Sequence, residues 1–259
     1  MLSQLEEVLQ HLVWLFIKRW ADRGQAVRQY MLRIGLAMLQ GARHEHIEAL
    51  MHASKEVNIE IEIVELRKSS QIDSEISALI LPGGESTTMR KASKSESLLD
   101  GIFDWMDEFS NRPVLGTCAG AIILSNPGEQ RKPYISAQIS RNAWGRQRQS
   151  FEAELEIELE TPVSNPTKEL ELQRDNFNHK PLKVSQEAAV SDSDSYPGVF
   201  IRAPRFLRNS IKCTTVATLE DEVVGILDGR KLALTFHPEL TLDRRFHRWL
   251  IVEAKNNFS

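Results

Sequence analysis

A cysteine stands between two glycines in the segment Gly116-Thr117-Cys118-Ala119-Gly120. Apolar residues 114–115 precede the segment and apolar residues 121–124 follow it, which predicts a strand that turns sharply into a helix. A nucleophile on such a turn needs neighbours without bulky side chains, and the start of a helix favours a thiolate there. We predict that Cys118 is a nucleophile, the alternative being a buried structural thiol.

A nucleophilic thiol requires a base, and that base requires a group that orients it. The segment His237-Pro238-Glu239 supplies both types of residue, late in the chain and after the predicted short strand 232–236. In an extended backbone, residues two positions apart face the same way, so His237 and Glu239 are expected to lie side by side. We predict that His237 accepts the Cys118 proton and that Glu239 holds the tautomer of the imidazole.

A glycine turn follows the mostly apolar run 76–81, in Pro82-Gly83-Gly84-Glu85-Ser86-Thr87. Backbone N–H groups in such a turn can face an oxyanion or a phosphate. The chain lacks the glycine-rich spacings of nucleotide-binding loops, so we favour an oxyanion hole built from Gly83, Gly84 and the N–H of Ala119. An ordinary helix-capping turn is the alternative.

The elements that must position these motifs alternate in the first half of the chain, which predicts a parallel sheet with helices on both faces. Strands are expected at residues 32–38, 59–66, 76–81 and 114–116, and helices at 45–54, 96–109 and 119–125.

The second half has a different pattern. Apolar residues alternate with glutamates over residues 151–160, as in a strand with one face in water. We predict one α/β domain with a central mixed sheet and the nucleophile at the carboxyl end of a strand. The remaining elements are expected as strands at residues 199–203, 213–219, 223–227 and 232–236 and a final helix at 242–255.

Two segments differ from this main domain, residues 31–259. Residues 1–30 show apolar residues at helical spacing and are predicted to be a helical extension, which packs on its own domain, forms an upstream extension or contacts another subunit. Residues 161–197 are polar and are predicted to be a surface insertion without a catalytic role.

Composition excludes several classes of protein. With 259 residues, 41% hydrophobic and 26% charged, the chain is long and apolar enough for a globular core. Its net charge of −4 provides no basic field for nucleic acid or an anionic membrane, and apolar residues 12–17 are too few for a membrane span. Two cysteines and the absence of a secretory pattern predict a cytoplasmic protein.

The predicted chemistry requires neither a metal nor a cofactor. His44 and His46 flank Glu45, but helical residues two positions apart do not face each other. We therefore expect these histidines to be solvated or hydrogen-bonded locally.

Together the three motifs resemble those of the class I, triad-type glutamine amidotransferases. Additional stretches are similar to the glutaminase subunits of pyridoxal 5′-phosphate synthase, namely residues 35–42, 141–147, 150–153 and 198–204. The resemblance implies a three-layer, flavodoxin-like fold with a central mixed, largely parallel sheet. It also implies hydrolysis of L-glutamine to L-glutamate and ammonia, and transfer of that ammonia to a barrel-shaped synthase subunit that forms pyridoxal 5′-phosphate.

The resemblance also assigns roles to individual residues. It implies that Cys118 is the nucleophile, His237 the base and Glu239 its partner, and that Gln40 organises the oxyanion side when the complex forms. An arginine side chain can bind the α-carboxylate of a substrate through two hydrogen bonds, which suits Arg141 or Arg202. The residues matched to glutamine binding are Gly84, Glu85, Ser86, Arg141, Ile201 and Arg202.

Alternative functions remain open. The chain could be a glutaminase for another synthase, a cysteine hydrolase of a different amide, or a catalytically idle regulatory or scaffold subunit. The stretches around Arg141 and Arg202 argue against the first two. The joint presence of Cys118, His237 and Glu239 argues against the third.

Overall fold

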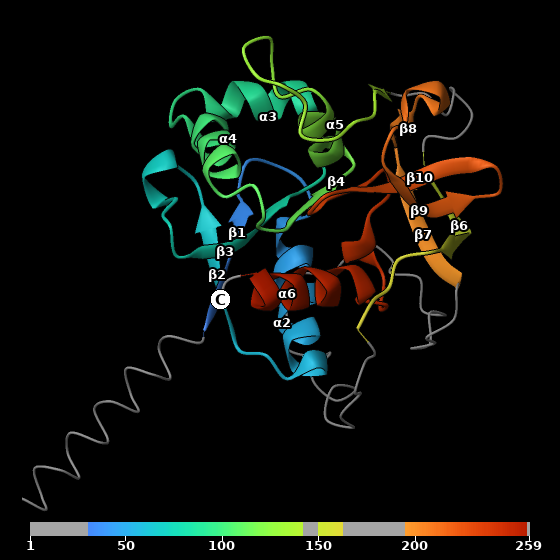
Figure 1. The fold of residues 1–259 in the computed structure, drawn as a ribbon, viewed down its shortest axis with the longest axis horizontal. Coiled ribbons are helices and arrows are strands. Elements are labelled where there is room, and N and C mark those ends of the chain that lie inside the picture. The colour runs from blue at the N-terminus through green and yellow to red at the C-terminus, as the bar shows by residue number, and fades with distance from the viewer. Residues whose placement is uncertain (1–30, 142–149, 163–194, 258–259) are drawn as a thin grey trace, which may run out of the picture. The chain divides into compact units, whose positions relative to one another are not determined.

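The computed structural model describes residues 31–141, 150–162 and 195–257 (Figure 1). Residues from Leu32 onward form one compact unit. The predicted helical extension, residues 1–30, lies outside the described residues, as does most of the predicted polar insertion.

Nine strands of the described residues form one mixed sheet, in the order β2-β1-β3-β4-β11-β10-β9-β6-β7. One half of the sheet is parallel and the other is antiparallel, which confirms the predicted central mixed sheet with a parallel core. The parallel half contains β1 (Leu32–Ala37), β2 (Ile61–Leu66), β3 (Ile76–Leu81), β4 (Val114–Thr117) and β11 (Lys231–Leu234). The antiparallel half contains β10 (Glu222–Asp228), β9 (Thr214–Leu219), β6 (Ser150–Ile157) and β7 (Ser195–Ile201).

Burial along individual strands explains why the sequence patterns of the two halves differ. All six residues of β3 are buried, because helices cover both faces of the parallel half. In β6, Leu155 and Ile157 are buried while Glu152, Glu154 and Glu156 are exposed. The prediction of a strand with one face in water is confirmed for residues 151–157, whereas residues 158–160 lie beyond the end of β6.

Helices cover the parallel half of the sheet in two layers (Figure 1). Side chains of Ala78 and Ile80 join one core, while Leu79 and Leu81 of the same strand join the other. This alternation confirms the predicted three-layer α/β arrangement. One face carries α2 (Arg43–Val57) and α6 (Arg245–Asn257), and the other carries α3 (Ser86–Ser93), α4 (Leu98–Glu108) and α5 (Ala119–Ser125).

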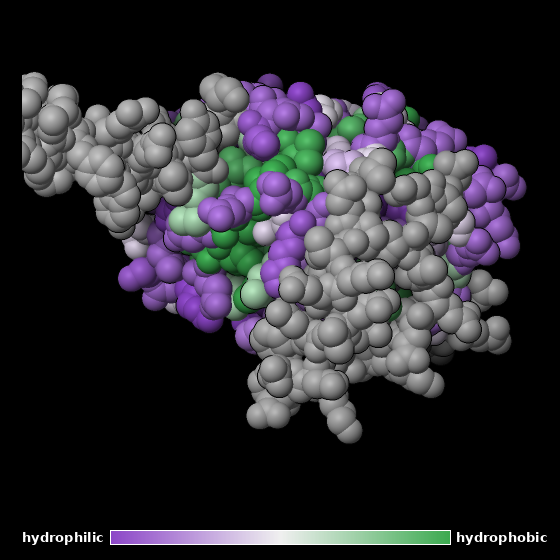
Figure 2. All heavy atoms as spheres, turned by 90° about the horizontal axis from the view of Figure 1, so that it is seen from below, coloured by the Kyte–Doolittle hydropathy of each residue, from purple (hydrophilic) through white to green (hydrophobic). Residues whose placement is uncertain are grey.

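Smaller elements complete the described fold. Strands β5 (Ile139–Ser140) and β8 (Arg205–Phe206) form a separate antiparallel pair. The 3₁₀ turns are η1 (Ser69–Gln71), η3 (Arg208–Ser210) and η4 (Pro238–Leu240). No helix within the described ranges is long and apolar enough to cross a membrane. Figure 2 shows the molecule from below, and the described residues on this face are mainly hydrophilic around a smaller hydrophobic area.

Several predicted bounds differ from the structure, and the start of β7 differs most clearly. The strand predicted at residues 199–203 spans Ser195–Ile201, and its residues 195–197, which were included in the predicted polar insertion, pair with β6. Tyr196 is fully buried there, and its hydroxyl lies 2.7 Å from Thr241 Oγ1. Polar composition concealed the beginning of this strand because neighbouring Ser195 and Pro197 are typical of loops.

The turn from β4 into α5 has no room for added side chains. A Cβ atom at Gly120 would lie 1.9 Å from the carbonyl oxygen of Leu81, and one at Gly116 would lie 2.6 Å from Leu124 Cδ1. These distances confirm the prediction that small residues must flank Cys118, because backbone and helix meet there at close range.

We expect Gly120→Ala to lower the free energy of unfolding by about 4 kcal/mol or more, because the new methyl group would overlap a backbone atom that cannot rotate away. Gly128→Ala is the matched control. Gly128 has a φ of +133° with open space around it, so its substitution introduces backbone strain alone, about 1–2 kcal/mol. Denaturant unfolding of both variants checks the prediction, which fails if Gly120→Ala is no more destabilising than the control.

Candidate active site

Cys118 occupies a strained position between β4 and α5. Its φ of 48° and ψ of −104° are unusual for a residue with a side chain, and its N–H donates to the carbonyl oxygen of Leu234 over 2.8 Å. The thiol therefore lies at the carboxyl end of a parallel strand, as predicted. Ala119 begins the helix, and N–H groups of a first helical turn have no acceptor within the helix.

His237 and Glu239 form a direct contact just after β11. His237 Nδ1 lies 2.7 Å from Glu239 Oε1, so the predicted adjacency of the two side chains is confirmed. The backbone that brings them together was predicted wrongly, because Pro238 begins the 3₁₀ turn η4 instead of continuing an extended chain. Proline suits that first position because it has no N–H to leave unsatisfied.

The charges of this pair support each other. Burial disfavours the charged form of His237, but the carboxylate of Glu239 and the side chain of Cys118 outweigh it and raise the His237 pKa to about 10. Burial likewise disfavours the Glu239 carboxylate, yet His46 and His237 lower the Glu239 pKa to about 2. Near neutral pH, His237 is thus an imidazolium next to Cys118.

The glycine turn after β3 lies against this pair. A Cβ atom at Gly83 would lie 2.5 Å from His237 Cε1 and 3.4 Å from Cys118 Cβ. Gly84 has a φ of +142°, a backbone conformation that favours glycine, and it packs against the side chain of Gln40. The structure therefore brings Gly83, Gly84 and the start of α5 together around Cys118.

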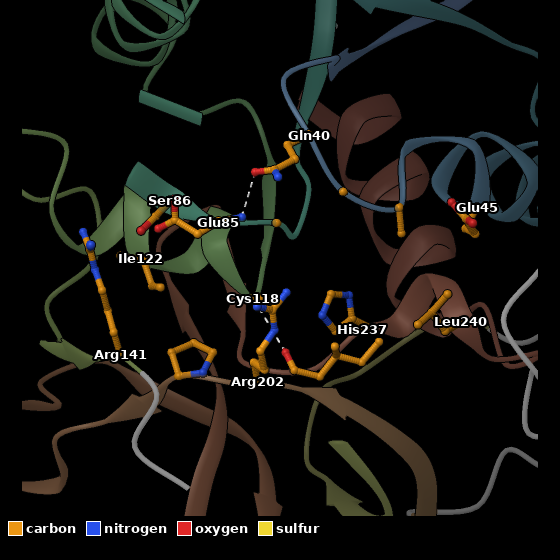
Figure 3. Close-up of a pocket in the computed structure, with 15 residues that line it drawn as sticks. Gln40, Glu45, Glu85, Ser86, Cys118, Ile122, Arg141, Arg202, His237 and Leu240 are labelled. Carbon is orange, nitrogen blue, oxygen red and sulfur yellow. Dashed lines mark hydrogen bonds between the residues drawn. The ribbon is translucent and has the colours of Figure 1, made fainter. Parts of the chain in front are cut away.

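Glu85 is engaged at both its carboxylate and its N–H group. Its carboxylate caps α3 by accepting hydrogen bonds from the N–H groups of Thr87 and Thr88, over 3.0 and 2.6 Å. Together with the Thr88 hydroxyl, these bonds lower the Glu85 pKa to about 2. The N–H of Glu85 donates to Gln40 Oε1 over 2.9 Å (Figure 3). The alternative interpretation of this segment, an ordinary helix-capping turn, is therefore correct for the side chain of Glu85.

A cavity of about 480 Å³ opens over Cys118 and His237 (Figure 3). Arg141 extends along one side, where its Nη1 donates to Thr87 Oγ1 over 3.0 Å, and Arg202 has a strained φ of 44°. Gly83, Ala119 and Glu239 do not line the cavity. The predicted residues that do are Gln40, Gly84, Glu85, Ser86, Cys118, Arg141, Ile201, Arg202 and His237, and Glu45, Ile122 and Leu240 line it without having been predicted.

The expectation for His46 was wrong. His44 is exposed, but His46 is fully buried, and its Nε2 lies 3.4 Å from Glu239 Oε2. Its Nδ1 lies 3.0 Å from Nε2 of His247, a residue 201 positions away in the sequence. The spacing rule correctly separated His44 from His46, but it gave no signal of a partner so distant in the chain. Within the described ranges, no group of three or more His, Cys, Asp or Glu residues is arranged to hold a metal ion.

Comparison with known proteins identifies the family of this chain. The sequence profile of the SNO glutamine amidotransferase family matches residues 36–165 and 168–256. The chain belongs to this family. The membership confirms the resemblance inferred from the motifs around Cys118 and His237.

Relatives extend over most of the chain. A Thermococcus onnurineus protein named pyridoxal 5′-phosphate synthase subunit PdxT is 36% identical over 86% of this chain and 100% of its own length. A Methanosarcina barkeri protein of the same name is 34% identical over 87% of this chain and 100% of its own. A crystal structure described as a glutamine amidotransferase has 35% identity and a TM-score of 0.61, covering 85% of this chain and 98% of that one. The predicted fold class is thereby confirmed.

We expect Glu239→Gln to lower the free energy of unfolding by about 3 kcal/mol near pH 6, because His237 loses its buried counter-charge. The contribution of Glu239 to the free energy of unfolding is present above the usual carboxyl pKa, near 4.3, and is lost as the pH falls toward 2. The contribution of His237 to the free energy of unfolding is complete below the usual imidazole pKa, near 6.5, and is lost as the pH rises toward 10.

The difference in free energy of unfolding between the natural protein and Glu239→Gln should therefore be largest between about pH 4.3 and 6.5. It should become smaller below and above this pH range. Urea unfolding of the two proteins across the pH range measures it. A difference that does not change with pH would rule out the charged pair.

Proposed function

We propose that Cys118, His237 and Glu239 hydrolyse the side-chain amide of L-glutamine. Membership of a glutamine amidotransferase family supports this activity. The observation that carries the residue assignment is the placement of Cys118 and His237 together at one cavity, with Glu239 bonded to the far side of the imidazole. This is the arrangement of nucleophile, base and orienting group that covalent hydrolysis needs.

Acylation begins with the Cys118 thiolate, which attacks the amide carbon of glutamine. The oxyanion that forms is stabilised by N–H groups of Ala119 and of the Gly83-Gly84 turn. The His237 imidazolium donates its Nε2 proton to the departing nitrogen, so that the C–N bond breaks and ammonia leaves. A γ-glutamyl thioester on Cys118 and a neutral His237 remain.

Deacylation reverses the proton transfer. Neutral His237 takes a proton from water, and the resulting hydroxide adds to the thioester carbon. Collapse of this second tetrahedral intermediate breaks the C–S bond and releases glutamate. Cys118 returns to the thiolate and His237 to the imidazolium, while Glu239 keeps the ring oriented throughout.

The substrate is held from the cavity wall. Arg141 and Arg202 supply guanidinium groups for the α-carboxylate of glutamine, which favours an amino-acid amide over a neutral amide. Gly84, Ser86 and Ile201 provide polar backbone or hydroxyl groups around it. The cavity volume, about 480 Å³, is ample for one amino acid.

The names of the relatives suggest where the ammonia from this reaction is used, because both relatives are named as subunits of pyridoxal 5′-phosphate synthase. We propose that this chain supplies ammonia to a barrel-shaped synthase subunit for pyridoxal 5′-phosphate formation. Gln40 is the residue through which we expect the synthase subunit to activate the enzyme. Its side-chain oxygen accepts a hydrogen bond from the Glu85 N–H, next to the glycine turn that is proposed to bind the oxyanion. Binding of the synthase subunit would reposition Gln40 and complete that side.

We expect Cys118→Ala to reduce glutamate release from glutamine by about 10⁴-fold or more, because among the described residues that line the cavity no other side chain carries a thiol. The assay measures glutamate from purified protein with and without a pyridoxal 5′-phosphate synthase subunit. Release by the variant equal to that of the natural protein would exclude Cys118 as the nucleophile. Release that ignores the synthase subunit would point to another synthase, and none in either condition would favour a scaffold.

We expect Arg141→Met to raise KM for glutamine by about 10- to 100-fold, because charge-assisted hydrogen bonds to the α-carboxylate are lost. Arg131→Met is the matched control, since Arg131 bonds Asp104 and Asp107 outside the cavity. Steady-state kinetics of both variants check the prediction. An unchanged KM in Arg141→Met would assign the α-carboxylate to another group.

A further inference from the structure

A chain of buried polar groups continues behind Glu239, away from the cavity. One carboxylate oxygen, Oε1, contacts His237, while the other, Oε2, faces Nε2 of His46 at 3.4 Å. The opposite ring nitrogen of His46 lies 3.0 Å from His247 Nε2. Both of these histidines have no exposed surface, and they come from two different helices, α2 and α6.

The two histidines are neutral. Burial lowers the pKa of His46 and lowers that of His247 well below its usual value. Each ring therefore carries one N–H, and one hydrogen atom lies between His46 Nδ1 and His247 Nε2. Two arrangements satisfy this contact, and they differ in which ring donates.

In the first arrangement His46 donates from Nδ1. Its Nε2 could then accept a hydrogen bond from the Thr117 hydroxyl, but it would also direct its lone pair toward the Glu239 carboxylate, and His247 would carry its hydrogen on Nδ1. That atom has no hydrogen-bond partner among the described residues, so a buried N–H would be left unsatisfied. This arrangement combines a repulsive contact with a lost hydrogen bond.

In the second arrangement His247 donates from Nε2 to His46 Nδ1. The N–H of His46 then lies on Nε2, 3.4 Å from Glu239 Oε2, a buried carboxylate oxygen that has no hydrogen-bond partner within the described residues. The unpartnered nitrogen of His247 carries only a lone pair. His46 Nε2 also forms a hydrogen bond with Thr117 Oγ1 over 3.4 Å, so the same N–H lies between a hydroxyl and a carboxylate, and the carboxylate attracts it more strongly.

The geometry points to His46 as a positioning residue for Glu239, acting through an Nε2–H group that His247 keeps in place. This inference rests on the proposed glutamine hydrolysis. A carboxylate turns easily about its terminal torsion, so contact with His237 alone leaves the second oxygen free to rotate. His46 restrains that oxygen, which keeps Oε1 directed at His237 Nδ1 and the imidazole directed at Cys118.

Three variants at two positions test the role in catalysis. We expect His46→Leu to lower kcat by about 10- to 100-fold with KM changed less than about twofold, as for other residues that orient a catalytic group. His46→Gln should stay within about threefold of the natural kcat, because its amide nitrogen replaces Nε2. In a Glu239→Ala background, His46→Leu should have no further effect, since the group it positions is gone.

Glu56→Gln is the matched structural control. Glu56 is buried at the same contact between α2 and α6, where its carboxylate lies 2.9 Å from both Arg244 and Arg248. We expect this variant to unfold more easily while keeping its kcat. The proposal is overturned if His46→Gln loses as much kcat as His46→Leu, or if His46→Leu and Glu239→Ala multiply their effects in the double variant.

A measurement on the resting protein separates this inference from the proposed function. Two-bond ¹H–¹⁵N NMR spectra report which ring nitrogen of each histidine carries the hydrogen, with signals assigned through His46→Gln and His247→Gln. We expect Nε2–H on both His46 and His247, whether or not glutamine is hydrolysed. Hydrogen on Nδ1 of either ring overturns the inference, whereas failure of glutamate release with both rings as expected overturns the proposed function only.

Discussion

The Glu239 carboxylate is a negative charge whose side chain has no exposed surface, and the architecture around the active site meets the demands of that burial. A buried charge is costly unless hydrogen bonds and opposite charge surround it. His237 supplies both at one oxygen, and His46 faces the other. His237 immediately precedes η4 and His46 belongs to α2, so the placement of the Glu239 carboxylate depends on the packing of helices against the sheet as much as on its own turn.

The sheet order accounts for the meeting of the three motifs. Strands β3, β4 and β11 are neighbours in the parallel half, and their carboxyl ends lead into the Gly83 turn, Cys118 and His237. Adjacent parallel strands place the loops that follow them at one edge of the sheet, where ligands of α/β proteins bind. The strained backbone at Cys118 is held there by close packing, since Gly116 and Gly120 leave no space for movement.

Local patterns in the sequence were sufficient for much of this fold. Strand β3 and helix α5 have the predicted bounds, and alternation within β6 revealed its solvent face. Backbone detail was less accessible: His237 and Glu239 meet through a 3₁₀ turn, although an extended link was predicted. Tyr196 shows the same limit, because its burial and its hydroxyl contact with Thr241 depend on distant residues, while its neighbours Ser195 and Pro197 are typical of loops.

The sequence by itself determined the family, the fold class and the residue types that can act as nucleophile, base and orienting acid, because periodicity and short motifs record local constraints. Only the tertiary structure decided which buried groups touch one another. Glu85 turned its carboxylate to cap α3, and His46 met Glu239 and His247 across the fold. Hydrogen bonds and buried charges depend on distances in space, and residues 201 positions apart in sequence leave no local pattern by which a contact could be read.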